Sequence, residues 1–334
     1  GNKPVRAILD KIGVKQVTVV PEQELPNGNF PTCPYPNPEI RQAFKCALAL
    51  AEDIKPDLLL ATDPDCDRVG IAIPSGDGYR LMTGNEVGAL LLNFVLDRRK
   101  ENGTLPAHPL AVKTIVSTEL CARIAEEYGC ELVNVLTGFK YIGEQIGILE
   151  EKGEESRYVF GFEESYGYLA GTAVRDKDAV VASMLICEMT AFYKSHGASL
   201  TDVLEQLYRR YGYYRNVQKS FTCEGQSGMK KIADTMERLR SESISELDGS
   251  AVIKVNDYQT SVSRSMPDGK ETRITLPRSN VLSYFTADGS SLIVRPSGTE
   301  PKIKLYIGAV GETAESAEKK SAALEESGIK LLGF

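Results

Sequence analysis

Residues 112–165 read VKTIVSTELCARIAEEYGCELVNVLTGFKYIGEQIGILEEKGEESRYVFGFEES, and short apolar runs alternate with longer amphipathic segments along this stretch. The apolar runs are typical of buried strands and the amphipathic segments of helices. Strands and helices that alternate with short connections predict a parallel sheet covered by helices. Ligands bind beyond the carboxyl ends of such strands, so we expect a site where TGFK (137–140) and GFEES (161–165) follow theirs.

The chain on either side of this stretch extends the pattern to three segments, residues 1–82, 83–215 and 216–334. In the first, VKQVTVVP (14–21) is expected to be a strand, and the acidic loop TDPDCDR (62–68) lies between two apolar runs that read as buried strands. The third segment has a mixture of helical and strand-like runs, which predicts an α+β domain with an antiparallel sheet.

Composition limits the class of protein. The chain has 334 residues, of which 42% are hydrophobic, and its 39 Lys+Arg against 46 Asp+Glu give a net charge of −7. These values are ordinary for a globular protein and argue against a disordered, collagen-like or coiled-coil chain. The mild acidity argues against a broad nucleic-acid surface, although a few local basic residues can still attract a small anionic substrate.

The cysteines and the apolar runs bear on the compartment. The seven cysteines form no C-x-x-C pair and read as reduced thiols of a cytoplasmic protein. No apolar run approaches the roughly 20 residues that span a bilayer, and the first residues lack the apolar core of a signal peptide. His108 and His196 lie near neither each other nor a cysteine in the sequence, so a histidine-based zinc site is not expected.

Three carboxylates, Asp63, Asp65 and Asp67, stand at alternate positions of the acidic loop. They repel one another, and a chain that keeps such groups together generally compensates them with a hard cation such as Mg²⁺, Mn²⁺ or Ca²⁺. A calcium-binding EF-hand loop is excluded because its sixth position is Arg68 rather than Gly and its twelfth is Pro74 rather than Glu. The simpler alternative is an acidic surface turn in which the Asp side chains cap backbone groups.

The loop RPSGTEP (295–301) lies between two apolar runs. Arg295 offers a planar fork for phosphate oxygens, Ser297 and Thr299 offer hydroxyls, and Gly298 allows close approach of a ligand to the backbone. These donors suit a phosphate monoester. The alternative is a tight hairpin turn in which Arg295 pairs with Glu300.

Two weaker candidates follow the predicted parallel strands. The adjacent carboxylates and the hydroxyl of GFEESYG (161–167) could hydrogen-bond neighbouring sugar hydroxyls, but glycine-flanked acidic loops are common. Lys140 of TGFK is expected near a helix start, where its charge is unfavourable for the helix dipole. This suggests another use for the side chain, although a solvated lysine is the more frequent explanation.

The four loops TDPDCDR, TGFK, GFEES and RPSGTEP occur in an order that resembles the α-D-phosphohexomutase family, in its phosphoglucomutase/phosphomannomutase branch. The resemblance implies an α/β fold, with two αβ three-layer domains followed by a smaller α+β domain. Residues 1–82 would be domain II with the metal loop, 83–215 domain III with the sugar loop, and 216–334 domain IV with the phosphate loop. The family's phosphorylated serine motif, similar to T-A-S-H-N-P, is not found, so the chain resembles a fragment that starts after domain I and is expected to be inactive alone.

The resemblance also implies a role for each candidate residue. Mg²⁺ would be held by Asp63, Asp65 and Asp67, with Arg68 near the reacting phosphate. The sugar would be recognised by Lys140, Glu163 and Ser165. The non-reacting phosphate would be held by Arg295, Ser297, Gly298 and Thr299.

The implied reaction interconverts hexose 1-phosphate and hexose 6-phosphate, with glucose as the favoured hexose. A phosphoserine enzyme and a 1,6-bisphosphate intermediate would carry the phosphoryl group. A non-catalytic protein that binds or senses sugar phosphates is the alternative from another class. A phosphatase with an Asp nucleophile is disfavoured, because its D-x-D-x-[TV] motif does not occur near the start of the fold.

Overall fold

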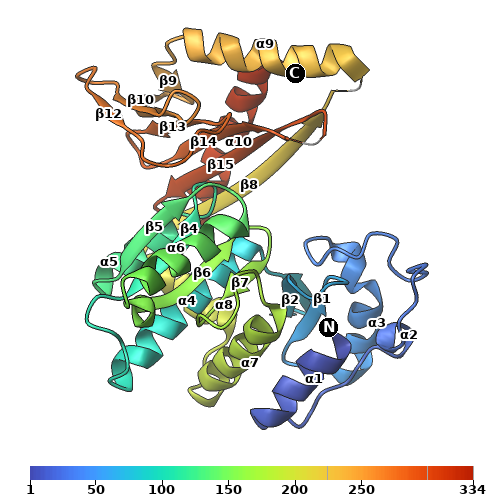
Figure 1. Ribbon diagram of the computed structural model, residues 1–334. Helices are drawn as coiled ribbons and strands as arrows, with labels where there is room; N and C mark the ends of the chain where they lie inside the picture. Colours follow the sequence, from blue (N-terminus) through green and yellow to red (C-terminus); the bar gives the residue numbers. More distant parts are fainter. Residues whose placement is uncertain (224, 299, 334) are drawn as a thin grey trace. The chain divides into compact units, whose positions relative to one another are not determined.

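The computed structural model describes residues 1–223, 225–298 and 300–333, and Figure 1 shows its helices and strands. The chain forms two compact units, Gly1–Leu207 and Tyr208–Phe334. Each unit has its own sheets and its own core, and each is described here by itself.

The first unit begins with a small antiparallel sheet in the order β1-β2-β3, formed by Leu59–Thr62, Val69–Ser75 and Gly78–Leu81. Helix α3 (Lys45–Ile54) follows a 3₁₀ turn at Arg41–Phe44. The apolar side chains of this segment pack against the sheet and form a small core that includes Phe44, Ala51, Leu59 and Ala72. The acidic loop is the connection between β1 and β2, as the sequence predicted.

The strand expected at residues 14–21 is wrong. Residues 14–20 lie outside the described strands, between helix α1 (Asn2–Lys11) and the short helix α2 (Pro21–Glu24). Val17 is 42% exposed, and the side chains of residues 15–18 all face solvent. An alternating apolar run becomes a strand only where a neighbouring strand completes its hydrogen-bond ladder, and this run has no such neighbour among the described residues.

The second sheet of this unit carries the stretch that alternates between strands and helices. Its order is β5-β4-β6-β7, formed by Glu131–Val135, Leu110–Thr114, Tyr158–Glu163 and Gly167–Leu169. The first three strands are parallel, as predicted, and β7 pairs antiparallel with β6 at the edge.

Helices cover both faces of this sheet. Helix α6 (Phe139–Glu151) packs its apolar face on one side of the sheet, where Ile142 and Ile146 meet Leu110 and Val112. Helix α4 (Gly84–Glu101) packs on the other side, where Gly88 faces the ring of Phe162. The remaining helical elements are α5 (Leu120–Glu127), a 3₁₀ turn at Glu155–Arg157, α7 (Ala179–Ser195) and α8 (Leu200–Tyr211). The result is the expected three-layer αβ arrangement.

The second unit contains one eight-stranded sheet in the order β12-β11-β10-β13-β14-β15-β8, with β9 paired to β10. All of its neighbours are antiparallel, as predicted. The strands are β8 (Tyr213–Thr222), β9 (Glu246–Leu247), β10 (Ser250–Asp257), β11 (Val262–Ser265), β12 (Glu271–Arg273), β13 (Leu282–Thr286), β14 (Ser291–Pro296) and β15 (Lys302–Gly311). Helices α9 (Gly225–Ser241) and α10 (Ala314–Leu332) contribute Met236 and Leu324 to the core against the sheet.

Two further findings concern the whole described chain. Each described helix is too short or too polar to cross a lipid bilayer. All seven cysteines are free thiols.

Candidate functional site

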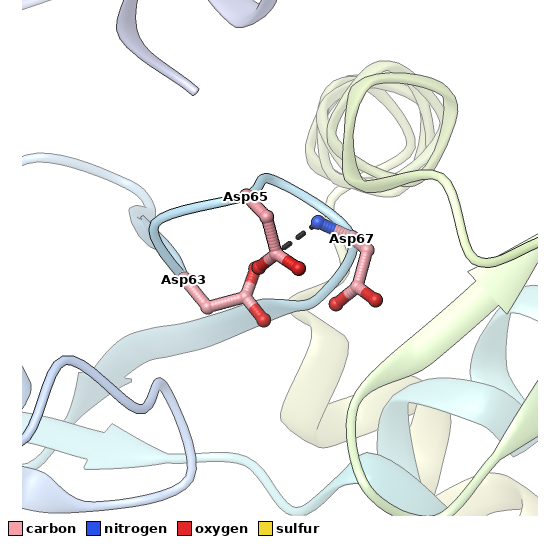
Figure 2. A group of neighbouring side chains, drawn as sticks. All are labelled: Asp63, Asp65 and Asp67. Carbon is pink, nitrogen blue, oxygen red and sulfur yellow. Dashed lines mark hydrogen bonds between the residues drawn. The ribbon is translucent and has the colours of Figure 1, made fainter.

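The carboxylates of Asp63, Asp65 and Asp67 converge in the loop between β1 and β2 (Figure 2). One oxygen from each can be chosen so that all lie within 4.8 Å of one another. The loop is folded around Asp63, whose Oδ1 accepts the backbone N–H groups of Asp67 and Arg68, both at 3.0 Å. Cys66 adopts a left-handed backbone conformation with φ of 61°, which turns the chain so that the three side chains meet.

The electrostatics of this loop fit a hard cation. Burial is the largest cause that raises the pKa of Asp63, to about 6; the neighbouring carboxylates of Asp67 and Asp65 contribute to the rise, and the backbone N–H of Arg68 opposes it. Asp67 Oδ1 is buried and accepts no hydrogen bond from the described residues. An ion such as Mg²⁺ would satisfy this oxygen and favour the ionised form of all three acids, so the residues present fit the metal.

Two cations of the chain lie beside the acidic loop. The Nε of Arg68 is 3.8 Å from both Asp63 Oδ2 and Asp67 Oδ1, and its Nη1 is 3.3 Å from Glu39 Oε1. The Nζ of Lys177 lies 2.9 Å from Asp67 Oδ2. Sequence reasoning missed Lys177. The charged run 175–178 (RDKD) directly before α7 was the available signal.

The loops TGFK and GFEES meet at the carboxyl ends of β5 and β6, as the parallel-sheet rule predicted. Glu163 is only 5% exposed, and its Oε1 accepts the backbone N–H of Gly138 at 2.6 Å. Burial raises the pKa of Glu163, and the charge of Glu164 raises it further. Lys140 is the second residue of α6 and is exposed, with its Nζ 4.9 Å from the ring centre of Tyr141. Ser165 is half-buried in the turn that links β6 to β7.

Backbone hydrogen bonds join the acidic loop to the GFEES loop. The N–H of Val69 donates to the carbonyl of Tyr166 at 3.1 Å, and Arg68 forms an isolated antiparallel bridge with Gly167. On the other side of the loop, the N–H of Ala179 donates to the carbonyl of Cys66 at 3.2 Å. The three carboxylates and Glu163 are therefore held by one connected framework within the first unit.

The fourth predicted loop is the hairpin between β14 and β15 in the second unit. It is closed by a hydrogen bond from Ser297 N to Lys302 O at 2.8 Å, and Ser297 Oγ accepts the N–H of Glu300 at 3.3 Å. Glu300 pairs with Lys302 at 3.1 Å rather than with Arg295, whose Nη1 donates to Tyr306 Oη at 3.5 Å. A side chain at Gly298 would meet open space. Thr299 lies outside the described residues.

Family models match three successive parts of the chain. Residues 1–76 match phosphoglucomutase/phosphomannomutase alpha/beta/alpha domain II, residues 83–211 match alpha/beta/alpha domain III, and residues 241–325 match the C-terminal domain. The chain belongs to the phosphoglucomutase/phosphomannomutase family. The family resemblance that the four loops indicated, and the α/β fold class that it implied, are confirmed.

Curated relatives agree with this assignment. The chain is 37% identical over 303 residues to a phosphoglucomutase of Staphylococcus saprophyticus, and 38% identical over 304 residues to one of Staphylococcus aureus. These matches cover 90% and 91% of this chain but 54% of each relative, so the chain spans about half the length of the curated relatives it matches.

Solved structures confirm the fold. The phosphoglucomutase pp63/parafusin from Paramecium matches 89% of this chain and 50% of its own, with a TM-score of 0.63 and 18% identity. A putative phosphomannomutase from Thermus thermophilus matches 99% of this chain and 58% of its own, with a TM-score of 0.63 and 19% identity.

Proposed function

We propose that the protein containing this chain is a phosphoglucomutase that interconverts glucose 1-phosphate and glucose 6-phosphate. The observation that carries the proposal is the framework in which three converging carboxylates are hydrogen-bonded, through their loop, to the loop that holds Glu163. As the family resemblance implies, the reaction would pass through a phosphoserine enzyme and glucose 1,6-bisphosphate.

In this proposal Asp63, Asp65 and Asp67 hold Mg²⁺. The bound ion supplies positive charge that stabilises the phosphoryl group in transfer. Arg68 is braced between Glu39 and the acidic loop, and its guanidinium is proposed to lie near the reacting phosphate. Because the guanidinium is only partly exposed and already oriented, little side-chain entropy is lost when a phosphate binds.

Sugar recognition is assigned to Glu163, Ser165 and Lys140. Glu163 uses Oε1 to hold Gly138, and its Oε2 makes no hydrogen bond with the described residues, which leaves this oxygen for sugar hydroxyls. The phosphate that does not react is assigned to Arg295, Ser297, Gly298 and Thr299. The support for this assignment is the closed β14–β15 hairpin, in which Arg295 pairs with no carboxylate among the described residues.

We also propose the domain boundaries 1–82, 83–215 and 216–334, which limited proteolysis of the chain tests directly. The cytoplasm is the proposed compartment. The seven free thiols support it, because an oxidising compartment favours disulfides.

A coupled assay tests the proposed activity. The gene product that contains this chain is supplied with glucose 1-phosphate, Mg²⁺ and a trace of glucose 1,6-bisphosphate, and glucose 6-phosphate is measured with its NADP-dependent dehydrogenase. We expect turnover that is lost on chelation of the metal. Binding of glucose phosphates without any turnover would instead indicate a sugar-phosphate-binding protein, and binding of neither sugar phosphate would refute both assignments.

A further inference from the structure

Glu164 stands next to Glu163 in the chain but has different partners. Its Oε2 accepts from the hydroxyls of Thr114 at 3.0 Å and of Ser117 at 3.3 Å. Both hydroxyl-bearing residues are buried, with 0% and 3% exposure, at the carboxyl end of β4 and in the turn that follows. Neither the proposed metal site nor the proposed sugar contacts use Glu164, and the sequence alone did not distinguish it from the adjacent Glu163.

The hydroxyl protons can be counted. Thr114 Oγ1 and Ser117 Oγ also lie 2.8 Å from each other, so three oxygen–oxygen contacts share two protons. Either both hydroxyls donate to the carboxylate, or one hydroxyl donates to the other, which in turn donates to Glu164. In both arrangements the carboxylate is the final acceptor, and removing it would leave a buried donor without a partner. The two hydroxyls therefore depend on the Glu164 carboxylate as their hydrogen-bond acceptor.

The turn that bears these hydroxyls is itself fixed. Lys113 is fully buried, and its Nζ donates to Ser117 O at 3.1 Å and to Glu119 Oε1 at 2.8 Å. Asn85, near the start of α4, accepts the N–H of Thr118 at 2.8 Å. A satisfied polar network of this kind is rigid because each group would lose a hydrogen bond if it moved.

The backbone of Glu164 is held from the other side by α4. A Cβ placed on Gly84, the first residue of α4, would lie 2.0 Å from the carbonyl oxygen of Glu164. Tyr166, two residues further on, is in the left-handed region with φ of 67°. A bulky residue adopts that conformation only when its surroundings impose it. The loop is thus fixed through one side chain and one close backbone contact.

We propose that Glu164 is a positioning residue. Its carboxylate, hydrogen-bonded to Thr114 and Ser117, holds the GFEES loop in place. In that position Glu163 keeps its contact with Gly138 and presents its free oxygen to the sugar. The inference rests on the proposed function, in which Glu163 contacts sugar hydroxyls. It adds a requirement that the function alone does not contain, namely that sugar selectivity depends on a residue that does not touch the sugar.

The first experiment measures selectivity. The dissociation constants of glucose 6-phosphate and its 3-deoxy analogue are compared for this chain, for Glu164→Ala and for the exposed control Glu151→Ala. We expect the original chain and the control to prefer glucose 6-phosphate by about tenfold, the worth of one hydrogen bond to a charged group. Glu164→Ala should lose that preference, and Glu164→Gln should recover most of it because its amide oxygen can accept the same hydroxyls. A general loss of stability would weaken both ligands equally.

A second measurement needs no ligand. Glu164→Ala should speed hydrogen exchange of the Gly138 amide about tenfold. Glu163→Ala, which removes the contact with Gly138 directly, should have the same effect. The exchange rates of amides in β4 and β5 should stay unchanged in both variants. If Glu164→Ala does not fold, the pair Thr114→Val with Ser117→Ala removes the grip and keeps Glu164, with the same expected effects. If the original chain shows no preference for glucose 6-phosphate over its 3-deoxy analogue, the proposed function is wrong, and the exchange data alone then test the role of Glu164.

The positioning role is overturned if the Gly138 amide stays protected from exchange in Glu164→Ala. It is also overturned if the original chain shows the sugar preference and Glu164→Ala keeps it.

Discussion

Lys177 Nζ lies 2.9 Å from Asp67 Oδ2, so an ammonium group from the segment before α7 neutralises part of the acidic loop between β1 and β2. The same side chain packs over the ring of Phe139, 5.6 Å from its centre, at the start of α6. Lys177 therefore reaches from the proposed metal site to the loop proposed to select the sugar.

Replacing Lys177 with Met keeps the apolar stem and removes the charge. We expect Mg²⁺ to bind about tenfold more tightly, because a single positive charge at this distance repels a divalent ion by more than about 1 kcal/mol even in water. Titration calorimetry measures the affinity, and Lys177→Arg is the control that keeps the charge. An affinity that stays equal or weakens in Lys177→Met would show that the ammonium does not compete with the ion.

Metal binding by the acidic loop should appear as a gain in stability. A ligand present at 100 times its Kd stabilises the folded state by about 2.7 kcal/mol, so Mg²⁺ should raise the melting temperature of the chain. Asp65→Asn should abolish this rise with little effect on stability without metal, because Asp65 is exposed. Asp77→Asn, in the exposed turn between β2 and β3, is the matched control and should keep the rise. An equal rise in both variants would place the ion elsewhere.

The buried Glu163 predicts a pH-dependent stability difference. Its pKa is raised above the ordinary 4.5, so the fold disfavours its ionised form. That destabilisation is absent below pH 4.5, grows as the pH rises through the folded pKa, and is complete above it. Glu163→Gln keeps an acceptor for Gly138 and should gain more stability at pH 8 than at pH 4 by urea unfolding. The exposed substitution Glu151→Gln should give a difference independent of pH; the same flat result for Glu163→Gln would contradict the prediction.

The opposite dependence of stability on pH is expected for Asp288, in the turn between β13 and β14. Burial opposes its ionisation, but Lys320 at 2.8 Å and the hydroxyl of Thr286 outweigh this and lower the pKa to about 2. The stabilisation is present above the ordinary value of 3.8 and is lost as the pH falls toward 2. Asp288→Asn should cost on the order of 1–2 kcal/mol at pH 7, after allowance for its 29% exposure, and nothing near pH 2. Lys320→Met should show the same loss; a pH-independent effect in both would argue against the ion pair.

Two glycines give a paired test of the packing under the GFEES loop. Gly84→Ala would place a methyl group 2.0 Å from the carbonyl oxygen of Glu164, so α4 or the loop must shift, and we expect a loss of about 2–3 kcal/mol. Gly147 lies inside α6 with open space around its Cβ position. Gly147→Ala should therefore stabilise by about 0.5–1 kcal/mol through helix propensity. Chemical denaturation measures both, and a neutral Gly84→Ala would mean that the close contact is absent in solution.

The features that the sequence predicted correctly are local ones. The spacing of Asp63, Asp65 and Asp67 between two apolar runs was enough to predict a strand–loop–strand unit with converging acids, because the turn brings alternate residues together within a few positions. The alternation of strands and helices from 110 to 163 predicted a parallel sheet, and the rule for parallel strands then placed TGFK beside GFEES. The sequence did not predict strand β8, because Val217 and Phe221, which pack against the core, are separated by the polar residues 218–220.

Contacts between distant parts of the chain were decided by tertiary structure. Glu164 contacts Thr114, which is 50 positions away in the chain. Lys177, between β7 and α7, contacts Asp67 in the loop between β1 and β2. Strand order and the packing of α4 and α7 set such pairs, and neither is encoded in a short window of residues. Residues 14–20 also show that a local pattern is not sufficient. This run has the composition of a strand but stays irregular, because no neighbouring strand among the described residues completes its hydrogen-bond ladder. The sequence thus specified which chemically active side chains the protein carries. The fold specified which other groups neutralise, hold and orient those side chains, because hydrogen bonds and ion pairs depend on distance in space rather than along the chain.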